Sequence, residues 1–411
     1  MKINILKAVE THLPDHLSGV IERAAGLAER KNHHLYLVGG LVRDTLLNLP
    51  NSDVDLVFEG DAVELGRELA NSVGGSLTIH EKFHTAKLKI GSHHIDLATV
   101  RAETYARPGA LPTVHAGTLK DDLFRRDFTI NALAIRLTGP HKGELIDYFD
   151  GQQDLKNKVI RVLHDKSFID DATRIWRAVR YEQRLAFLIE PVTLILLKKG
   201  VIYLSTVSGD RIRHELELVL KEKTPEKILQ RASGLKILSQ IHPALKADAR
   251  LGREFKAARA FDGHLHEVYY ALLAHHLNVK ELEDFIAYLK PAKKITETLR
   301  DSVKLKNICE LDDENLLQST VFHLLKGYSI PSVITNAIAT PSSNIRENSK
   351  LYYEELRHAK PILTGDDLMQ MGISKGIEIK KLLKIILDAR LEGKVKSRHD
   401  EEKLVREYLI A

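Results

Sequence analysis

The sequence predicts an α+β fold, in which a small mixed sheet with its helices occupies about the first 140 residues and helices occupy the rest. Short strand-like runs alternate with helical ones up to about residue 140, and helical periods dominate from about Asp165 to the end of the 411 residues. Apolar residues make up 44% of the chain and charged residues 28%, which is ordinary for a folded protein. A chain of this length is expected to form roughly two to four domains.

The predicted elements of the first part follow from apolar spacing and from residues that end helices and strands. Apolar side chains at helical spacing predict a helix over Leu17–Arg30, and a second helix is predicted from Asp61 to the Gly74-Gly75 stop. The segment Tyr105–Gly117 carries Pro and Gly and is predicted to be a loop, and Ile160–Leu163 is predicted as a short strand. The other strands are predicted at Leu35–Val38, Ser76–Ile79, Ala86–Ile90 and His93–Val100.

The bulk composition narrows the class of protein. Cys309 is the single cysteine, which excludes an intramolecular disulfide and a cysteine-rich zinc site. Aromatic residues make up 6%, too few for extensive base stacking, and the net charge of +5 permits a nucleic-acid partner without demanding one. No apolar run approaches the roughly 20 residues of a membrane span, and the start, MKINILKAVE, lacks the apolar core of a secretory signal. We therefore expect a cytoplasmic protein with no membrane partner.

The segment from Gly39 to Asp55, GGLVRDTLLNLPNSDVD, carries the strongest functional signal. Gly39 and Gly40 precede a short amphipathic segment, where backbone amides can cradle phosphate, and Arg43 follows within reach of a triphosphate. The alternative for Arg43 is a pair with a neighbouring surface carboxylate. Asp53 and Asp55 are two residues apart, so an extended strand turns both to one side. Such a pair can hold two divalent ions roughly 3.5–4 Å apart for nucleotidyl transfer, and a solvated strand edge is the alternative.

Two further groups extend this candidate site. Asp96, in the strand His93–Val100, is a third candidate metal carboxylate, or else an edge carboxylate with a partner in a neighbouring loop. In the run RRDFTINA, Arg126 is placed to neutralise phosphate oxygens and Asn131 to bond a sugar or phosphate oxygen. A capped helix entry with Asp127 as the N-cap is compatible with the same run.

A helix that opens with acids and continues with arginines is predicted from Asp170 onward. Its sequence is DDATRIWRAVR, in which Arg174, Arg177 and Arg180 recur at every third position. A solvated basic face is the ordinary interpretation of such a helix. A fixed carboxylate at Asp171 could, however, accept the exocyclic amino group of cytosine or adenine while Arg174 donates to the adjacent ring acceptor. UTP and GTP would place an oxygen against that carboxylate at a cost of roughly 1–3 kcal/mol, so this pair could select C and A without a template.

The motifs GGLVRD, DVD, RRDFTINA and DDATRIWRAVR, in this order, resemble the signature motifs of class II tRNA nucleotidyltransferases. These are the CCA-adding enzymes and their bacterial poly(A) polymerase relatives, and the resemblance extends over residues from about 35 to 245. It implies a polymerase-β-like nucleotidyltransferase head at 1–145, a neck with base-reading and RNA-binding helices at 146–235, and a helical, tRNA-binding body and tail at 236–411. Where the base-reading motif of the family usually begins Glu-Asp-Pro, this chain has Asp170-Asp171-Ala172, which keeps the acid and loses the proline.

The resemblance also implies roles for individual residues. Asp53 and Asp55 would be the catalytic ligands of two Mg²⁺ ions, and Gly40, Arg43 and Arg126 would contact the triphosphate. Base selection would fall to Asp171 and Arg174. Nucleotide binding as a whole is thus expected at Gly39, Gly40, Arg43, Arg126, Asn131, Asp171, Arg174, Arg177 and Arg180.

The activity implied by the resemblance is template-independent addition of C and A from CTP and ATP to the 3′ end of tRNA, with release of pyrophosphate. The terminal 3′-hydroxyl would attack the α-phosphate in line at the two-metal site. Alternatives within the enzyme class are addition of A alone, addition of CC alone, and poly(A) polymerisation; the stretch 101–119, which the family's CC-only members shorten, is of full length here. A catalytically silent tRNA-binding relative is the alternative outside that class, and intact Asp53, Asp55 and Arg126 argue against it. The sequence leaves the oligomeric state open.

Overall fold

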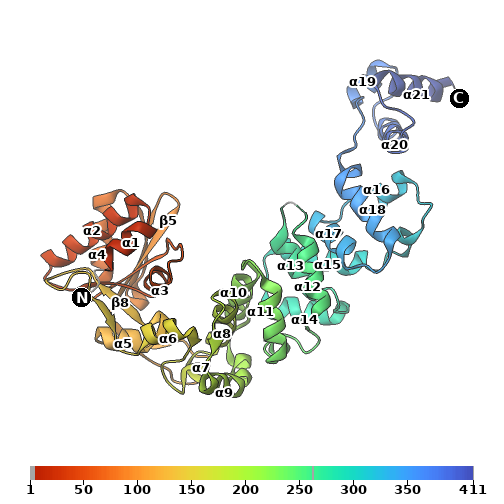
Figure 1. Ribbon diagram of the computed structural model, residues 1–411. Helices are drawn as coiled ribbons and strands as arrows, with labels where there is room; N and C mark the ends of the chain where they lie inside the picture. The colour runs from red at the N-terminus through yellow and green to blue at the C-terminus, as the bar shows by residue number, and fades with distance from the viewer. Residues whose placement is uncertain (1–4, 262, 411) are drawn as a thin grey trace. The chain divides into compact units, whose positions relative to one another are not determined.

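The computed structural model describes residues 5–261 and 263–410, which fall into two compact units (Figure 1). Unit 1 comprises the residues up to 215 together with 235–240, and unit 2 comprises 216–234 and the residues from 241 onward. Residues 1–4 and 411 lie outside the described residues, and with them the first four residues of MKINILKAVE and the outer ends of the predicted head and tail. The domain boundaries predicted at 145 and 235 stay predictions.

Unit 1 is built on a mixed sheet, in which the described strands number seven in the order β3-β4-β5-β2-β1-β8-β9. They are β1 (Leu35–Val38), β2 (Val54–Phe58), β3 (Ser76–His80), β4 (Thr85–Ile90), β5 (His93–Thr99), β8 (Leu133–Arg136) and β9 (Leu145–Asp147). Strands β2 and β5 are parallel, and the other neighbours are antiparallel. Smaller pairs are the antiparallel hairpin β6 (Arg101–Thr104) and β7 (Thr113–Ala116) and the parallel pair β10 (Val159–Ile160) and β11 (Leu188–Ile189).

Helices cover both faces of this sheet (Figure 1). The helices of unit 1 are α1 (Leu6–His12), α2 (Asp15–Arg30), α3 (Gly40–Leu46), α4 (Ala62–Val73), α5 (Leu119–Phe124), α6 (Gly151–Asn157), α7 (Ser167–Asp170), α8 (Thr173–Arg184) and α9 (Pro191–Gly200), with the 3-10 helices η1 (Glu81–Phe83), η2 (Thr129–Asn131), η3 (Val201–Thr206) and η4 (Leu238–Gln240). Helix α4 packs against β4 and β5 and against α2. Leu119 and Leu123 of α5 share a buried core with Val57 of β2. Because side chains alternate along a strand, Asp55 lies on the same face as Val57.

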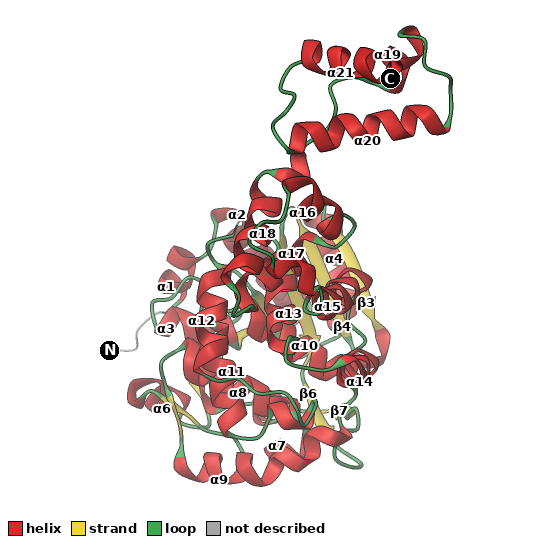
Figure 2. Ribbon diagram, turned by 90° about the vertical axis from the view of Figure 1, so that its right-hand side faces the viewer, coloured by secondary structure: helices red, strands yellow, loops and turns green. Residues whose placement is uncertain are grey.

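Unit 2 is helical in its described residues, and the strands, yellow in Figure 2, all belong to unit 1 in the part of the chain that the structure describes. Helix α10 (Gly209–Leu220) continues from unit 1 into unit 2. The other elements of unit 2 are α11 (Pro225–Gly234), α12 (Ala249–Ala258), α13 (Leu265–Ala274), α14 (Val279–Leu289), α15 (Lys293–Leu305), η5 (Cys309–Asp312), α16 (Gln318–Leu325), α17 (Ile330–Ala339), α18 (Ser343–Glu354), η6 (Leu356–His358), α19 (Gly365–Gln370), α20 (Ile377–Leu391) and α21 (Arg398–Ile410). Among the described helices, none combines the length and the apolar character needed to span a bilayer.

The predicted fold class is confirmed, and most local predictions hold. Helix α4 begins after Asp61, whose side chain accepts hydrogen bonds from two backbone amides of the first turn, and it ends at Gly74 with φ of 75°. These elements were predictable because their signals are local in sequence. The predicted loop Tyr105–Gly117 is wrong over Thr113–Ala116, which pairs with β6 as strand β7. Strand β7 forms by pairing with β6, and the Pro and Gly residues between the two strands hide this pairing from an analysis of the sequence.

Three other predictions need correction. The helix predicted from Asp170 onward begins only at Thr173, as α8, because Asp170 ends α7 and the backbone of Asp171 is extended. The strand predicted over Ile160–Leu163 overlaps the two-residue strand β10 only at Ile160, and Val162 makes an isolated bridge to Phe128 instead. The run RRDFTINA does not enter an α-helix with Asp127 as N-cap. It forms the single 3-10 turn η2, because Asp127 accepts hydrogen bonds from Phe128 N and the Asn131 amide.

Candidate active site

The carboxylates of the candidate site lie on β2 and β5. Asp53 immediately precedes β2, Asp55 lies within it, and Asp96 of β5 is in register with Asp55 across the parallel pair. Asp96 is half exposed and forms an ion pair with Lys87 at 3.3 Å. No described residue donates a hydrogen bond to, or forms an ion pair with, the carboxylate of Asp53 or Asp55. The two residues predicted to bind metal therefore carry charges that the described protein groups leave unpaired.

Asp55 lies in an electrostatic environment that a cation would relieve. Burial raises the pKa of Asp55 to about 6. Arg126 opposes this rise, and the charges of Asp96 and Asp53 add to it. The oxygen donors fit Mg²⁺, which proteins commonly bind through one or two carboxylates together with substrate phosphates. No three His, Cys, Asp or Glu side chains in the described part of the chain lie close enough to hold a metal ion by themselves, so other oxygens would have to complete the coordination shell.

Gly39 leaves room between the carboxylate and an arginine of the RRD motif. Its φ is +76°, and a Cβ atom there would lie 3.3 Å from Asp55 Oδ2 and 3.1 Å from Arg126 Nη1. Any other residue would be strained and would crowd both groups. Arg126 donates from Nη2 to Asp122 at 3.1 Å, and its Nε has no hydrogen-bond acceptor among the described residues. Arg126 and Asp55 thus lie on either side of the same glycine. Arg126 has an N–H donor, and Asp55 has carboxylate oxygens, that no described residue bonds.

Arg43 is an interior side chain. It is 2% exposed, and its Nε and Nη2 donate to the two oxygens of Asp44 at 2.7 and 2.8 Å. Its Nη1 donates to Asn131 Oδ1 at 2.7 Å. The carboxylate pair raised as the alternative from the sequence is therefore present, but it is buried and not at the surface. The direct phosphate and sugar contacts expected of Arg43 and Asn131 stay predictions, and both residues belong to a buried polar network.

Asp127 connects that network to helix α8. Its side chain accepts hydrogen bonds from Arg177 Nε at 2.8 Å and from Asn131 Nδ2 at 2.9 Å. Burial alone would raise the pKa of Asp127, but Arg177 and the Asn131 amide lower it to about 2. The third residue of the RRD motif therefore stays ionised and fixes Arg177, which lies 50 positions further along the chain.

Tyr181 gathers three of the arginines. The guanidinium carbons of Arg43, Arg177 and Arg180 lie 4.9, 5.6 and 5.2 Å from the centre of its ring. Arg177 Nη2 also donates to the Tyr181 hydroxyl at 3.3 Å. Arg180 lies 3.9 Å from Glu215 of α10, so this end of the cluster also meets a carboxylate. Cations over an aromatic face are attracted by its negative charge distribution. The ring of Tyr181 thus helps to orient arginines from the first motif, GGLVRD, and from the last, DDATRIWRAVR.

The pair predicted to select the base lies at the junction of α7 and α8: Asp171 follows α7, and Arg174 is in the first turn of α8. Asp171 Oδ1 accepts hydrogen bonds from Thr173 and from Arg211 Nη2 at 2.8 Å, whereas Oδ2 receives none from a described residue. Arg174 is 5% exposed and donates from Nη1 to Ser167 Oγ at 2.7 Å. Its Nη2 donates to the carbonyl oxygen of Arg125 at 2.6 Å. Each of these two side chains uses some of its polar atoms in hydrogen bonds to the protein and has other polar atoms that no described residue bonds.

Several residues of the site were not expected from the sequence. Tyr181 could have been found, because it follows the arginine run and lies four residues after Arg177 on the same helix face. Asp122 precedes Arg126 by four residues on and just after α5, which is the same signal. Arg211 carried no such signal, because it lies 40 positions from Asp171 in the sequence and only the fold brings the two side chains together.

Two family models match parts of this chain. The model described as Poly A polymerase head domain matches residues 35–161. The model described as Probable RNA and SrmB- binding site of polymerase A matches residues 186–248. The matched ranges contain the carboxylate strands, the RRD motif and Arg211, and the arginines of α8 lie between them.

Several known proteins align with almost the whole of this chain. An A-adding tRNA nucleotidyltransferase of Geobacter sulfurreducens is 36% identical over 97% of the chain, which spans only 48% of that relative's length. Another A-adding tRNA nucleotidyltransferase, from Halalkalibacterium halodurans, is 33% identical over 96% of the chain and 93% of the relative. Among solved structures, the Thermotoga maritima CCA-adding enzyme complexed with tRNA_CCA is 30% identical, with a TM-score of 0.78 over 98% of both chains.

Proposed function

This chain belongs to the family of tRNA nucleotidyltransferases and bacterial poly(A) polymerases, and we propose that it adds C and A from CTP and ATP to the 3′ end of tRNA without a template. In this reaction the terminal 3′-oxygen loses its proton and bonds to the α-phosphorus, and pyrophosphate leaves. The observation that carries the proposal is the continuous network Arg43–Asn131–Asp127–Arg177. It joins three separate motifs of the sequence into one site, whose carboxylate strand borders Arg126 at Gly39.

Selection of C and A is supported by the unused polar atoms at the start of α8. Asp171 Oδ2 is an acceptor for the exocyclic amino group of either base, because Arg211 and Thr173 both bond Oδ1. Arg174 is held by Ser167 and by the Arg125 carbonyl and still has N–H groups to donate to a ring acceptor. An oxygen of U or G opposite Asp171 would leave two acceptors facing each other without a donor, at a cost of about 1–3 kcal/mol.

The metal ions of the proposal would be held by Asp53 and Asp55, with Asp96 as the third candidate. Two Mg²⁺ ions, when bound, would supply electrostatic stabilisation of the charge that develops on the phosphate oxygens. The protein's own contribution is to keep the Asp55 carboxylate free of other partners and to leave space at Gly39. Arg126 adds positive charge beside the same glycine, where it would hold the triphosphate during transfer.

Addition of A alone is a second candidate, and the names of the two curated relatives support it. Both are called A-adding, and one of them aligns with this chain over almost its whole length. The solved structure, by contrast, is that of a CCA-adding enzyme. Both candidates share ATP, the tRNA end and the same site, and they differ in whether CTP is used.

The experiment that separates them offers the protein three tRNA transcripts, ending before CCA, after the first C and after CC. CTP and ATP are supplied separately and together with Mg²⁺, and the products are resolved to single nucleotides. We expect all three transcripts to be completed to CCA when both nucleotides are present. Incorporation only on the CC-ended transcript would assign addition of A alone, and long A tails would assign poly(A) polymerisation.

Two controls show whether the measured activity belongs to this protein and whether an inactive protein still binds tRNA. An Asp55→Asn variant reports any contaminating activity, and tRNA binding measured by gel shift reports whether the protein recognises the substrate. Absence of incorporation on every transcript by a folded protein that binds tRNA would overturn the proposed function.

A further inference from the structure

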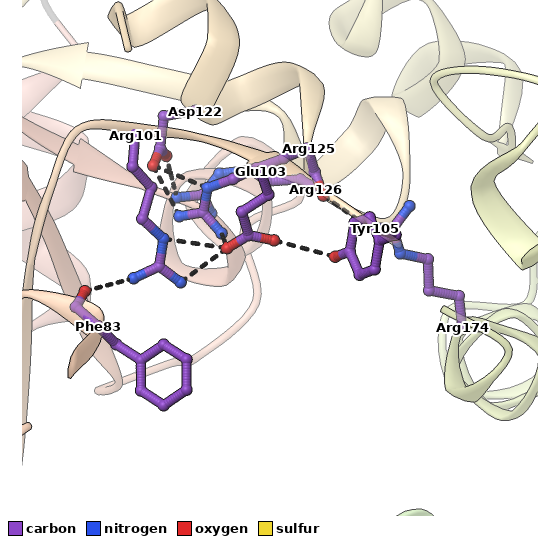
Figure 3. A network of polar contacts seen from close by, with 8 residues as sticks. All are labelled: Phe83, Arg101, Glu103, Tyr105, Asp122, Arg125, Arg126 and Arg174. Carbon is purple, nitrogen blue, oxygen red and sulfur yellow. Dashed lines mark hydrogen bonds and ion pairs between the residues drawn. The ribbon is translucent and has the colours of Figure 1, made fainter. Parts of the chain in front are cut away.

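Glu103 is a buried carboxylate on strand β6, next to the loop end of the β6–β7 hairpin, and it accepts four hydrogen bonds. Its side chain is 5% exposed. Oε1 accepts from Arg101 Nε and Nη2 at 3.0 and 2.8 Å and from Arg125 Nη1 at 3.1 Å. Oε2 accepts from the Tyr105 hydroxyl at 2.9 Å. Figure 3 shows three side chains directed toward Glu103: Arg101 and Tyr105 from the same segment of the chain, and Arg125, which follows α5. A carboxylate with this many donors is fixed in one orientation.

Arg125 is held between two carboxylates. Besides its bond to Glu103, it donates from Nε and Nη2 to Asp122 Oδ1 at 3.0 and 2.6 Å. The Asp122 side chain is fully buried. Burial would raise the pKa of Asp122, but Arg126 and Arg125 keep it below its usual value. All three nitrogens of the Arg125 guanidinium are thus engaged, and this side chain is occupied with the protein itself.

The main chain of Arg125 reaches the base-reading pair. Its carbonyl oxygen accepts from Arg174 Nη2 at 2.6 Å, as Figure 3 shows. The side-chain bonds to Glu103 and Asp122 restrain the residue that carries this carbonyl. A guanidinium is planar and its donors diverge at fixed angles, so the position of one acceptor sets the direction of the remaining N–H groups. The orientation of Arg174 therefore depends on Arg125 being held.

Tyr105, which follows strand β6, also bonds Glu103 and lies near the base-reading pair. Burial raises the pKa of Tyr105, so its hydroxyl stays protonated and donates to Glu103. Arg174 and Asp171 are both close enough for their charges to act on this hydroxyl, in opposite directions. Further along the hairpin, Gly109 approaches Thr206 of η3 so closely that a Cβ atom would lie 2.3 Å from the Thr206 carbonyl oxygen. The segment thus packs against η3 at Gly109 and lies within electrostatic reach of Asp171 and Arg174 at Tyr105.

We propose that Glu103 is a positioning residue for base selection, which holds Arg125 and Tyr105 and through them fixes the direction in which Arg174 donates. The inference rests on the proposed function and deepens it, because it assigns specificity to a residue that does not touch the nucleotide. A site built to hydrogen-bond one pattern of donors and acceptors discriminates only while its own groups are held in place. Loosening Glu103 should therefore lower discrimination between bases more than it lowers the rate of transfer.

The test compares Glu103→Gln with wild type on tRNA ending in CC, with ATP, CTP, GTP and UTP each measured for kcat and KM. Glu103→Gln keeps the size of the side chain but replaces one acceptor oxygen by an amide that meets the donors of Arg101, Arg125 or Tyr105. We expect discrimination against GTP and UTP to fall by about tenfold, the effect of losing one charge-assisted hydrogen bond. The change should appear in KM for ATP more than in kcat.

Two further variants keep the result interpretable. Glu81→Gln makes the same chemical change in an exposed ion pair with Arg67 and should leave all ratios as in wild type. Tyr105→Phe removes one of the four hydrogen bonds without unpairing a charge, and should lower discrimination by a smaller factor. If Glu103→Gln does not fold, Tyr105→Phe decides the matter alone.

Equal loss for all four nucleotides, or unchanged ratios in a folded Glu103→Gln or Tyr105→Phe protein, would overturn the inference. Failure of the proposed function looks different, because wild type itself would then add no nucleotide to any transcript.

Discussion

The two sides of the candidate site carry opposite charges, and the protein treats them in opposite ways. On the sheet side, Asp53 and Asp55 have no hydrogen bond or ion pair from any described residue, and burial raises the pKa of Asp55 to about 6. On the helix side, Arg174 and Arg177 are each bound by buried protein groups. The carboxylates of the sheet side therefore have no protein partner among the described residues, whereas the arginines of the helix side are already bonded to protein groups.

This difference indicates two separate tasks. Unpaired carboxylates are costly in the folded protein and favour a cation that brings its own charge. Arginines held by carboxylates, a carbonyl and an aromatic ring have lost their freedom before the nucleotide arrives, which is the condition for selective hydrogen bonding. We expect changes on the sheet side to alter the rate for every nucleotide, and changes on the helix side to alter the choice among nucleotides.

The largest expected effect is on the sheet side. Asp55→Asn, and separately Asp53→Asn, should lower nucleotide addition by about 10³-fold or more, since metal-ion stabilisation is worth several kcal/mol and 1.36 kcal/mol is tenfold in rate. Single-turnover incorporation on CC-ended tRNA at saturating Mg²⁺ measures the loss, and tRNA binding should stay near wild type. Asp210→Asn, which changes an exposed acid of unit 1, is the matched control. Full activity in both site variants would refute the metal assignment.

The second-largest effect is expected at Asp127, which links the RRD motif to helix α8. Asp127→Asn should lower the free energy of unfolding of unit 1 by about 3–5 kcal/mol, because it leaves the Arg177 charge without its buried partner. The change can be followed by fluorescence, since Trp176 is the single tryptophan and is buried in α8.

The contribution of Asp127 to stability has a defined pH dependence in wild type. The pKa of Asp127 in the folded protein, about 2, lies below its ordinary 3.8, so its contribution to stability is complete above about pH 4 and is lost as pH falls toward 2. Wild type should show this acid-dependent loss and Asp127→Asn should lack it. Identical pH profiles for the two proteins would contradict the role given to Asp127.

A smaller effect is expected at Tyr181. Tyr181→Leu removes the ring beneath three guanidinium groups and should raise the KM for ATP by roughly 5–30-fold, or about 1–2 kcal/mol. Tyr181→Phe keeps the ring and loses only the 3.3 Å hydrogen bond from Arg177, so its KM should change by less than about threefold. Steady-state kinetics on CC-ended tRNA distinguishes the two, and equal effects would show that the ring itself does not orient the arginines.

The smallest effect on the site is expected from unit 2. Burial of His275, with Lys306 and His276 nearby, lowers its pKa to about 4 from the ordinary 6.5. The unfolded chain then binds more protons than the folded one between these values, so stability should fall as pH decreases from about 6.5 to about 4. His275→Leu should remove that slope in the unfolding of unit 2, measured by hydrogen exchange, and leave nucleotide discrimination unchanged. A slope that persists in the variant would assign the effect to other groups.

The sequence predicted features whose signals are local, and it missed those that depend on distant contacts. The cap of α4 at Asp61 and its stop at Gly74 are decided within a few residues, and the motifs themselves named Asp55, Arg126 and Arg174 as candidates. The strand β7 escaped prediction because its hydrogen bonds go to β6 across a segment rich in Pro and Gly.

The contacts within the site could not be predicted for the same reason. Arg125 was available as a phosphate ligand by its chemistry, but two carboxylates, Asp122 of α5 and Glu103 of β6, occupy its guanidinium. The carbonyl of Arg125 meets Arg174 from 49 positions away in the sequence. Sequence spacing cannot show that a backbone oxygen so distant in the chain accepts a hydrogen bond from Arg174.

One measurement tests the division of tasks most directly. On CC-ended tRNA, kcat/KM is determined for ATP, CTP, GTP and UTP with wild type, Asp55→Asn and Arg174→Lys. We predict that Asp55→Asn lowers all four values by a similar factor. Arg174→Lys, which keeps the charge and loses the planar donor geometry, should reduce the preference for ATP over GTP by about tenfold or more. A wild-type preference that survives Arg174→Lys, or that collapses in Asp55→Asn, would contradict the account.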